Sequence, residues 1–118
     1  ANEEELLSLY ETEDFDAALA ALQQDTAVAA VTRSEKGSVV IGAGDPISVK
    51  AEPVDQVLDT TGAGDQYAAG FLFGISRGLP LETCAHLGHI AAAEVIAHFG
   101  PRPEQSYKTL AEQAGIYA

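Results

Sequence analysis

The chain has 118 residues, 47% of them hydrophobic and 20% charged, which is the composition of a sequence that folds around one core and excludes a disordered chain. Its net charge of -12 would repel nucleic-acid phosphates, so we expect no nucleic-acid partner. The single cysteine, Cys84, excludes an internal disulfide. No apolar run approaches the roughly 20 residues of a membrane span, and the first residues are acidic where a signal peptide is basic. We therefore expect a cytoplasmic protein that does not contact membranes.

The first 26 residues predict two helices, each with an acidic and solvated face. Thr12 and Asp14 are both candidate N-caps of the second helix. Its apolar positions recur at intervals of three and four residues, and we expect it to end near residues 23–25.

Three short apolar runs follow. Residues 27–32 form a continuous run, which is typical of a parallel-type strand buried on both faces. Residues 38–41 and 47–50 flank a turn-forming stretch, Gly-Ala-Gly-Asp-Pro, and predict a hairpin. A parallel strand needs parallel partners with crossover connections, and the chain supplies too few of them. We expect the C-terminal part of a larger α/β domain, or a domain completed by something else.

Two further helices are expected beyond residue 65. The first covers residues 66–77 and ends at Gly78, with Pro80 beyond it. The second, rich in alanine, runs from about residue 81 to 98, and its apolar positions cover most of its circumference, so it should be buried on more than one side. We expect Cys84 to pack in the core, and His86 and His98 to lie on the polar face with no role in metal binding.

The segment with chemical content is Thr61-Gly-Ala-Gly-Asp65, at the start of the helix expected from residue 66. Glycines permit tight turns and close approach of a ligand, and helix N-termini attract anions such as phosphate. A carboxylate beside a phosphate is repulsive unless it accepts a proton or meets a metal, and phosphoryl transfer needs such a base. The alternative is that Asp65 only caps the helix. The same letters at residues 42–45 precede a strand, so there we expect a plain turn.

Three motifs resemble those of one family. Residues 59–71 (DTTGAGDQYAAGF) closely resemble the C-terminal signature of the ribokinase-like (PfkB) family of sugar and nucleoside kinases. Asn2-x-x-Glu5 is similar to the family's Asn-x-x-Glu motif, and residues 31–37 resemble its nucleotide-binding Thr-x-Gly-x-x-Gly stretch. The motifs occur in the family's order, and the likeness continues to about residue 106. Within the family, residues 84–92 look most like the adenosine kinase branch.

The resemblance implies that residues 1–118 are the C-terminal, nucleotide-binding and catalytic part of a three-layer α/β/α fold that is incomplete on its own. It places the substrate-binding sheet, the lid and the usual dimer contacts before Asn2, so a homodimer is one expectation for a full-length protein. The implied activity is transfer of the γ-phosphoryl group of ATP to a hydroxymethyl group of a sugar or nucleoside, with an adenosine-like acceptor favoured. The alternative is a noncatalytic fragment that binds ATP or phosphate, and we expect the 118 residues alone to be inactive.

The resemblance also implies roles for single residues. Asp65 would be the catalytic base, and the N–H groups of Gly62, Ala63 and Gly64 would form the anion hole. Asn2 and Glu5 would act at the phosphates, with Glu5 holding Mg2+ through water, and Asp59 and Thr61 match the family's potassium site. The residues that would line ATP are Thr32, Arg33, Ser34, Gly37, His89 and Ala92. The sequence departs from the family at Ser34, which replaces the middle glycine and should alter contacts without abolishing binding.

Overall fold

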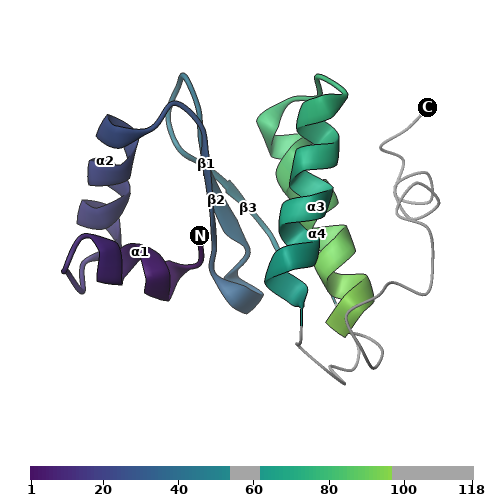
Figure 1. Cartoon of the computed structure of the whole chain (residues 1–118), viewed down its shortest axis with the longest axis horizontal. Coiled ribbons are helices and arrows are strands. Elements are labelled where there is room, and N and C mark those ends of the chain that lie inside the picture. The colour runs from purple at the N-terminus through teal and green to yellow at the C-terminus, as the bar shows by residue number, and fades with distance from the viewer. Residues whose placement is uncertain (54–61, 97–118) are drawn as a thin grey trace.

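The computed structural model describes residues 1–53 and 62–96, which form three layers (Figure 1). Helices α1 (Glu3–Leu9) and α2 (Phe15–Asp25) cover one face of a small sheet, and α3 (Ala63–Ser76) and α4 (Leu81–Ile96) cover the other. The sheet contains β1 (Ala29–Thr32), β2 (Ser38–Ile41) and β3 (Ile47–Val49), and a short 3-10 helix, η1 (Ser34–Lys36), connects β1 to β2. The expected α/β class is confirmed. None of the helices in these two ranges has the length and apolar character to cross a lipid bilayer.

The sheet is antiparallel, with the order β1-β2-β3. The predicted hairpin of β2 and β3 is confirmed. The prediction of a parallel-type β1 buried on both faces is met only in part: Val31 and Ala30 pack into opposite cores, but Val31 is the one fully buried residue of the strand, and β1 pairs antiparallel with β2. The connection of five residues between the two strands explains the direction, since a parallel pair needs a crossover of a dozen or more residues. A parallel bridge from Asn2 to Thr32 lies beside β1.

The helix ends follow local signals. Asp14 is the N-cap of α2 and accepts a hydrogen bond from the Ala17 N–H, whereas Thr12 accepts one from the Asp14 N–H. Helix α2 ends at Asp25, as predicted. Helix α3 ends before Gly78, which has a φ of 70°, as its sequence indicates. The predicted continuation of α4 to residue 98 lies outside the described residues.

Strand β2 divides the interior into two cores. Val39 and Ile41 face α1 and α2, whereas Val40 faces α3 and α4, because successive side chains of a strand point to opposite faces. All four residues of β2 are buried. Cys84 is completely buried in the second core, so its predicted packing role is confirmed, and the predicted burial of α4 on several sides agrees with its buried residues Cys84, Ala85, Leu87, Ile90 and Ala91.

Glycines allow α3 and α4 to pack closely. A Cβ atom at Gly70 would lie 2.5 Å from the Leu87 carbonyl oxygen, and one at Gly88 would lie 2.7 Å from the Tyr67 ring. Both distances are too short for any side chain, so the separation of the two helices depends on these glycines. The Tyr67 ring therefore lies directly against the α4 backbone.

Gly37 is a second point of close approach. It has a φ of 96°, a conformation that favours glycine, and an added Cβ would overlap the carbonyl oxygen of Val49 on β3. The turn between β1 and β2 can therefore lie against β3 only with glycine at this position.

We expect Gly37→Ala to lower the free energy of unfolding by at least about 2 kcal/mol, because it adds both backbone strain and a collision with backbone. Gly44→Ala is the matched control, since Gly44 also lies in a turn of the sheet but has open space around its Cβ position. Urea unfolding of the two variants measures the difference. Equal stability of both variants would contradict the role assigned to Gly37.

Candidate functional site

The turn between β1 and β2, residues 33–37, is called here the 33–37 loop. Two backbone hydrogen bonds within the loop connect its ends: the Arg33 N–H donates to the Gly37 carbonyl at 2.7 Å, and the Gly37 N–H donates to the Ser34 carbonyl at 3.1 Å. Ser34 has a φ of 53°, which few residues other than glycine adopt readily. Ser34 stands where the family's Thr-x-Gly-x-x-Gly motif has its middle glycine. Its left-handed backbone explains why the motif has glycine at this position, and it shows that serine can adopt the same conformation.

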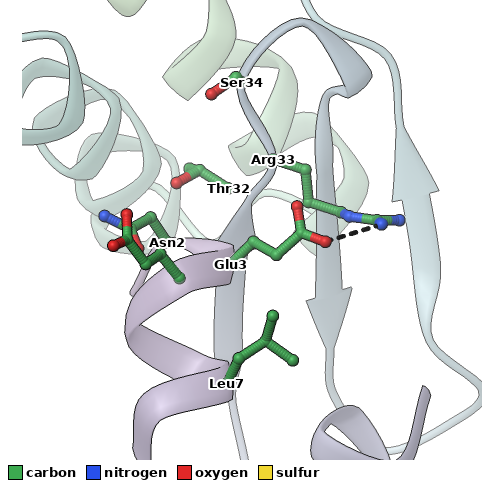
Figure 2. Close-up of a pocket in the computed structure, with 7 residues that line it drawn as sticks. Asn2, Glu3, Leu7, Thr32, Arg33 and Ser34 are labelled. Atoms are coloured by element: carbon green, nitrogen blue, oxygen red, sulfur yellow. Dashed lines mark hydrogen bonds and ion pairs between the residues drawn. The ribbon is translucent and has the colours of Figure 1, made fainter. Parts of the chain in front are cut away.

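A pocket of about 380 Å³ lies between this loop and the start of α1 (Figure 2). Residues 1 and 2 lie alongside β1, because the Thr32 N–H donates to the Ala1 carbonyl at 2.9 Å and Asn2 forms a parallel bridge with Thr32. Two motifs that are far apart in the sequence therefore meet at one place. The residues that line the pocket are Asn2, Glu3, Glu4, Leu7, Thr32, Arg33 and Ser34.

Arg33 is held by both N-terminal helices. Its Nη2 lies 3.0 Å from the Glu3 Oε1, and its guanidinium carbon lies 3.8 Å from the centre of the Phe15 ring. The hydrogen bond from Arg33 lowers the pKa of the Glu3 carboxyl, and the positive charge adds to this effect. Sequence analysis missed Glu3, and no spacing rule links residues that are 30 positions apart. Arg33 thus anchors the 33–37 loop to α1 and α2. The expected contact of Arg33 with ATP stays a prediction.

Asn2 and Glu5 form a capping box at the start of α1. The Asn2 side chain accepts from the Glu5 N–H at 2.7 Å, and Glu5 Oε1 accepts from the Asn2 N–H at 2.9 Å. The second carboxylate oxygen of Glu5 takes no part in the box, and the residue is exposed. A magnesium ion keeps most of its water, so a single exposed carboxylate fits a water-mediated contact. No cluster of three potential metal ligands occurs in the parts of the chain that the structure describes.

The start of α3 differs from the sequence-based expectation in one respect. Gly62, with a φ of 80°, is the N-cap, and the helix begins at Ala63, so the alternative in which Asp65 caps the helix is wrong. Asp65 lies in the first turn and is exposed. The first-turn N–H groups have no carbonyl partner within the helix, as at helix N-termini that attract anions, and an added Cβ at Gly64 would meet open space. The predicted cation ligands Asp59 and Thr61 lie outside the described residues.

The first turn of α3 and the 33–37 loop lie toward the same end of the molecule, the lower end in Figure 1. The structure thus places the Asn-x-x-Glu motif and the nucleotide motif together, and it directs the glycine-rich helix start toward the end of the sheet where they meet. The predicted roles of Gly62, Ala63, Gly64 and Asp65 at a phosphoryl group stay predictions.

A buried hydrogen-bond network connects β2 with α3 and α4. The Tyr67 hydroxyl donates to the Ser38 Oγ at 2.9 Å, and the same Oγ lies 2.9 Å from the His89 Nε2. The Tyr67 and His89 rings meet edge to face with centres 5.0 Å apart. The pKa of His89 is lowered to about 4, chiefly by burial and to a smaller extent by the neighbouring His86, while a backbone hydrogen bond with Val49 opposes both effects. Burial likewise raises the pKa of Tyr67.

Sequence analysis did not find this network. Tyr67 is buried in the core, but neither its hydroxyl nor Ser38 carries a recognisable signal in the sequence. His89 was expected to line ATP; the residue is only 6% exposed and its Nε2 faces Ser38, so the contact with ATP stays a prediction. Ala92 is half-buried and packs against the same core. His86 is exposed on α4, as predicted.

Known proteins that resemble this chain belong to the family whose motifs it carries. The family described as pfkB family carbohydrate kinase matches residues 1–107. A cytidine kinase of Thermococcus kodakarensis is 40% identical over 102 residues, which cover 84% of this chain and 36% of the relative. The crystal structure of adenosine kinase from Sinorhizobium meliloti is 56% identical, with a TM-score of 0.92 over 96% of this chain and 35% of that chain.

A ribokinase from Arabidopsis thaliana, solved in complex with ribose and ATP, is 29% identical, with a TM-score of 0.83 over 94% of this chain and 38% of that chain. The fold of the chain is therefore ribokinase-like. The chain spans little more than a third of the length of these relatives, from 35% to 38%.

We expect the free energy of unfolding to fall as the pH drops from about 6.5 toward 4. In this range the unfolded chain binds a proton at His89, with a pKa near 6.5, whereas the folded protein keeps His89 neutral, so the proton favours the unfolded state. The contribution is fully present above pH 6.5, and about 1–3 kcal/mol is lost over this window. Urea unfolding at several pH values measures the loss. His89→Gln removes it while the carboxylates still titrate, so identical pH profiles for the two proteins would contradict this role.

Proposed function

Because this chain belongs to the pfkB family of carbohydrate kinases, we propose that it forms the nucleotide-binding and catalytic part of an ATP-dependent kinase for sugars or nucleosides. The observation that carries the proposal is the pocket in which Asn2 and the 33–37 loop meet, because it joins two of the family's motifs that are distant in sequence. In this proposal, residues 1–118 are the C-terminal part of a longer protein whose preceding residues bind the acceptor. The homodimer and the cytoplasmic location belong to that proposal as well.

The proposed acceptor is a hydroxymethyl group, with an adenosine-like nucleoside favoured. Support for a nucleoside comes from the likeness to the adenosine kinase of Sinorhizobium meliloti, which at 56% identity exceeds the 29% identity to the ribokinase of Arabidopsis thaliana. The same likeness supports the resemblance of residues 84–92 to the adenosine kinase branch.

In the proposed reaction the acceptor oxygen attacks the γ-phosphorus, a new O–P bond forms, and the bond from the γ-phosphorus to the β–γ bridging oxygen breaks to release ADP. The exposed carboxylate of Asp65 takes the proton of the attacking hydroxyl. The first-turn N–H groups of α3, at Ala63 and Gly64, stabilise the charge on the transferred group, together with the Gly62 N–H. Glu5 would hold magnesium through water, and the bound ion would supply positive charge against the triphosphate.

The second candidate function is a noncatalytic module that binds ATP or phosphate. The feature that favours it is the start of α3, whose first-turn N–H groups can bind an anion without any catalytic step. A phosphoryl-transfer assay with adenosine and with ribose, run on the 118 residues alone and on a longer protein that contains them, separates the two functions. Turnover by the longer protein alone supports the kinase as we propose it.

We expect Asp65→Asn in the complete enzyme to lower kcat by about 10²–10⁴-fold with little change in the affinity for ATP, because the amide cannot accept the acceptor's proton. Asp45→Asn is the matched control, since Asp45 ends the same Gly-Ala-Gly-Asp sequence in an exposed turn with no helix behind it. Steady-state kinetics measure both variants. Full activity of Asp65→Asn would remove this carboxylate from the mechanism.

We also propose that potassium supports activity through Asp59 and Thr61, on the strength of the family motif in residues 59–65. Activity should then be higher in potassium than in sodium chloride at constant ionic strength. Rates are compared in the two salts and in the chloride of a bulky organic cation. Equal rates in all three would argue against a monovalent-cation site.

A further inference from the structure

The Ser38 hydroxyl lies where the sheet meets both C-terminal helices, and it is 2% exposed. Resting on the proposed function, we propose that Tyr67 and His89 are positioning residues that act through this hydroxyl. They hold the 33–37 loop in a fixed position relative to the helix that carries Asp65.

The backbone around Ser38 already ties it to the loop. Ser38 directly follows Gly37 and is paired with Thr32 on β1 and with Val49 on β3. A displacement of Ser38 therefore moves both ends of the 33–37 loop, because residue 32 precedes the loop and residue 38 follows it. A group that fixes Ser38 fixes the loop.

The order of the hydrogen bonds gives the network a direction. The Tyr67 hydroxyl donates to the Ser38 Oγ, so the Ser38 proton is free to be donated to the His89 Nε2. This arrangement requires a neutral His89 that accepts at Nε2. Each of the three side chains then has its polar atom paired at 2.9 Å inside a core where an unpaired group would be costly.

Tyr67 lies two residues after Asp65 on α3, which is about 3 Å along the helix axis. The network therefore joins the loop to the helix within one turn of the proposed base. A shift of α3 by one residue would break the bond to Ser38 and move Asp65 by the same amount. The relative position of the loop and Asp65 is what in-line phosphoryl transfer depends on.

Packing alone does not account for the hydroxyl. The Tyr67 ring already packs against Phe71, with centres 6.2 Å apart, and against His89 and Gly88. Phenylalanine would make the same ring contacts without a polar atom that must be desolvated. The contribution that the Tyr67 hydroxyl adds to the ring contacts is therefore its hydrogen bond to Ser38.

The test uses Tyr67→Phe in the full-length protein. We expect the KM for ATP to rise about 3–10-fold, which is the factor one buried hydrogen bond is ordinarily worth, while the KM for the acceptor stays unchanged. A purely structural role would lower the stability and leave the KM for ATP as it is, so that result would overturn the proposal. Tyr10→Phe is the matched control, because its hydroxyl donates to Asp25 at 2.6 Å between α1 and α2.

A double-mutant cycle tests the route through Ser38. In a Ser38→Ala background the Tyr67 hydroxyl has lost its acceptor, so Tyr67→Phe should cause no further rise in the KM for ATP. A further rise of the same size as in the wild type would show that Tyr67 acts by another route and would overturn the proposal.

Amide hydrogen exchange separates this proposal from the proposed function, because it needs no kinase activity. Residues 33–38 should exchange faster in Tyr67→Phe than in the wild type or in Tyr10→Phe. Faster exchange supports the positioning role even if the wild type transfers no phosphoryl group. Unchanged exchange overturns it even if the wild type is an active kinase.

Discussion

The close packing of α3 on α4 is the constraint on which the C-terminal half of the structure depends. Gly88 leaves no room for a Cβ because the Tyr67 ring occupies that space, and Gly70 in turn lies against the Leu87 backbone. At this separation the Tyr67 hydroxyl reaches Ser38 on the sheet and His89 lies beside it. A larger residue at either glycine would push the helices apart and leave three buried polar atoms unpaired. The hydrogen-bond network therefore depends on the close packing of α3 on α4.

The features that sequence predicted correctly are those set by neighbouring residues: the Asp14 cap, the hairpin, the end of α3 before Gly78, and the burial of Cys84. Those it missed depend on long-range contacts. Ser38 meets His89 across 51 positions and Arg33 meets Glu3 across 30, and hydrophobic periodicity says nothing about such partners. The antiparallel pairing of β1 with β2 was not anticipated, because an apolar run does not encode its partner. Asp65 was mistaken as a possible cap because left-handed Gly62 starts the helix earlier.

The charge of the protein restricts how a triphosphate can be bound. The chain has a net charge of -12, Glu3 and Glu4 line the pocket, and Arg33 is already paired with Glu3. Long-range attraction of a polyanion is therefore absent, and local groups must supply the affinity. Backbone N–H groups at a helix start and a bound divalent cation are such groups, since they act at short range. The proposed binding of ATP is therefore compatible with the acidic charge of this chain.

The 33–37 loop is held from both faces of the sheet, and this explains how it keeps an unfavourable backbone. Ser34 and Gly37 both have positive φ, at 53° and 96°, which costs free energy at the serine. On one face Arg33 anchors the loop to Glu3 and Phe15; on the other, the network at Ser38 anchors it to α3 and α4. Since β2 contributes to both cores, the two anchors act on one continuous backbone. The backbone of the 33–37 loop is thus held by contacts within the chain on both faces of the sheet.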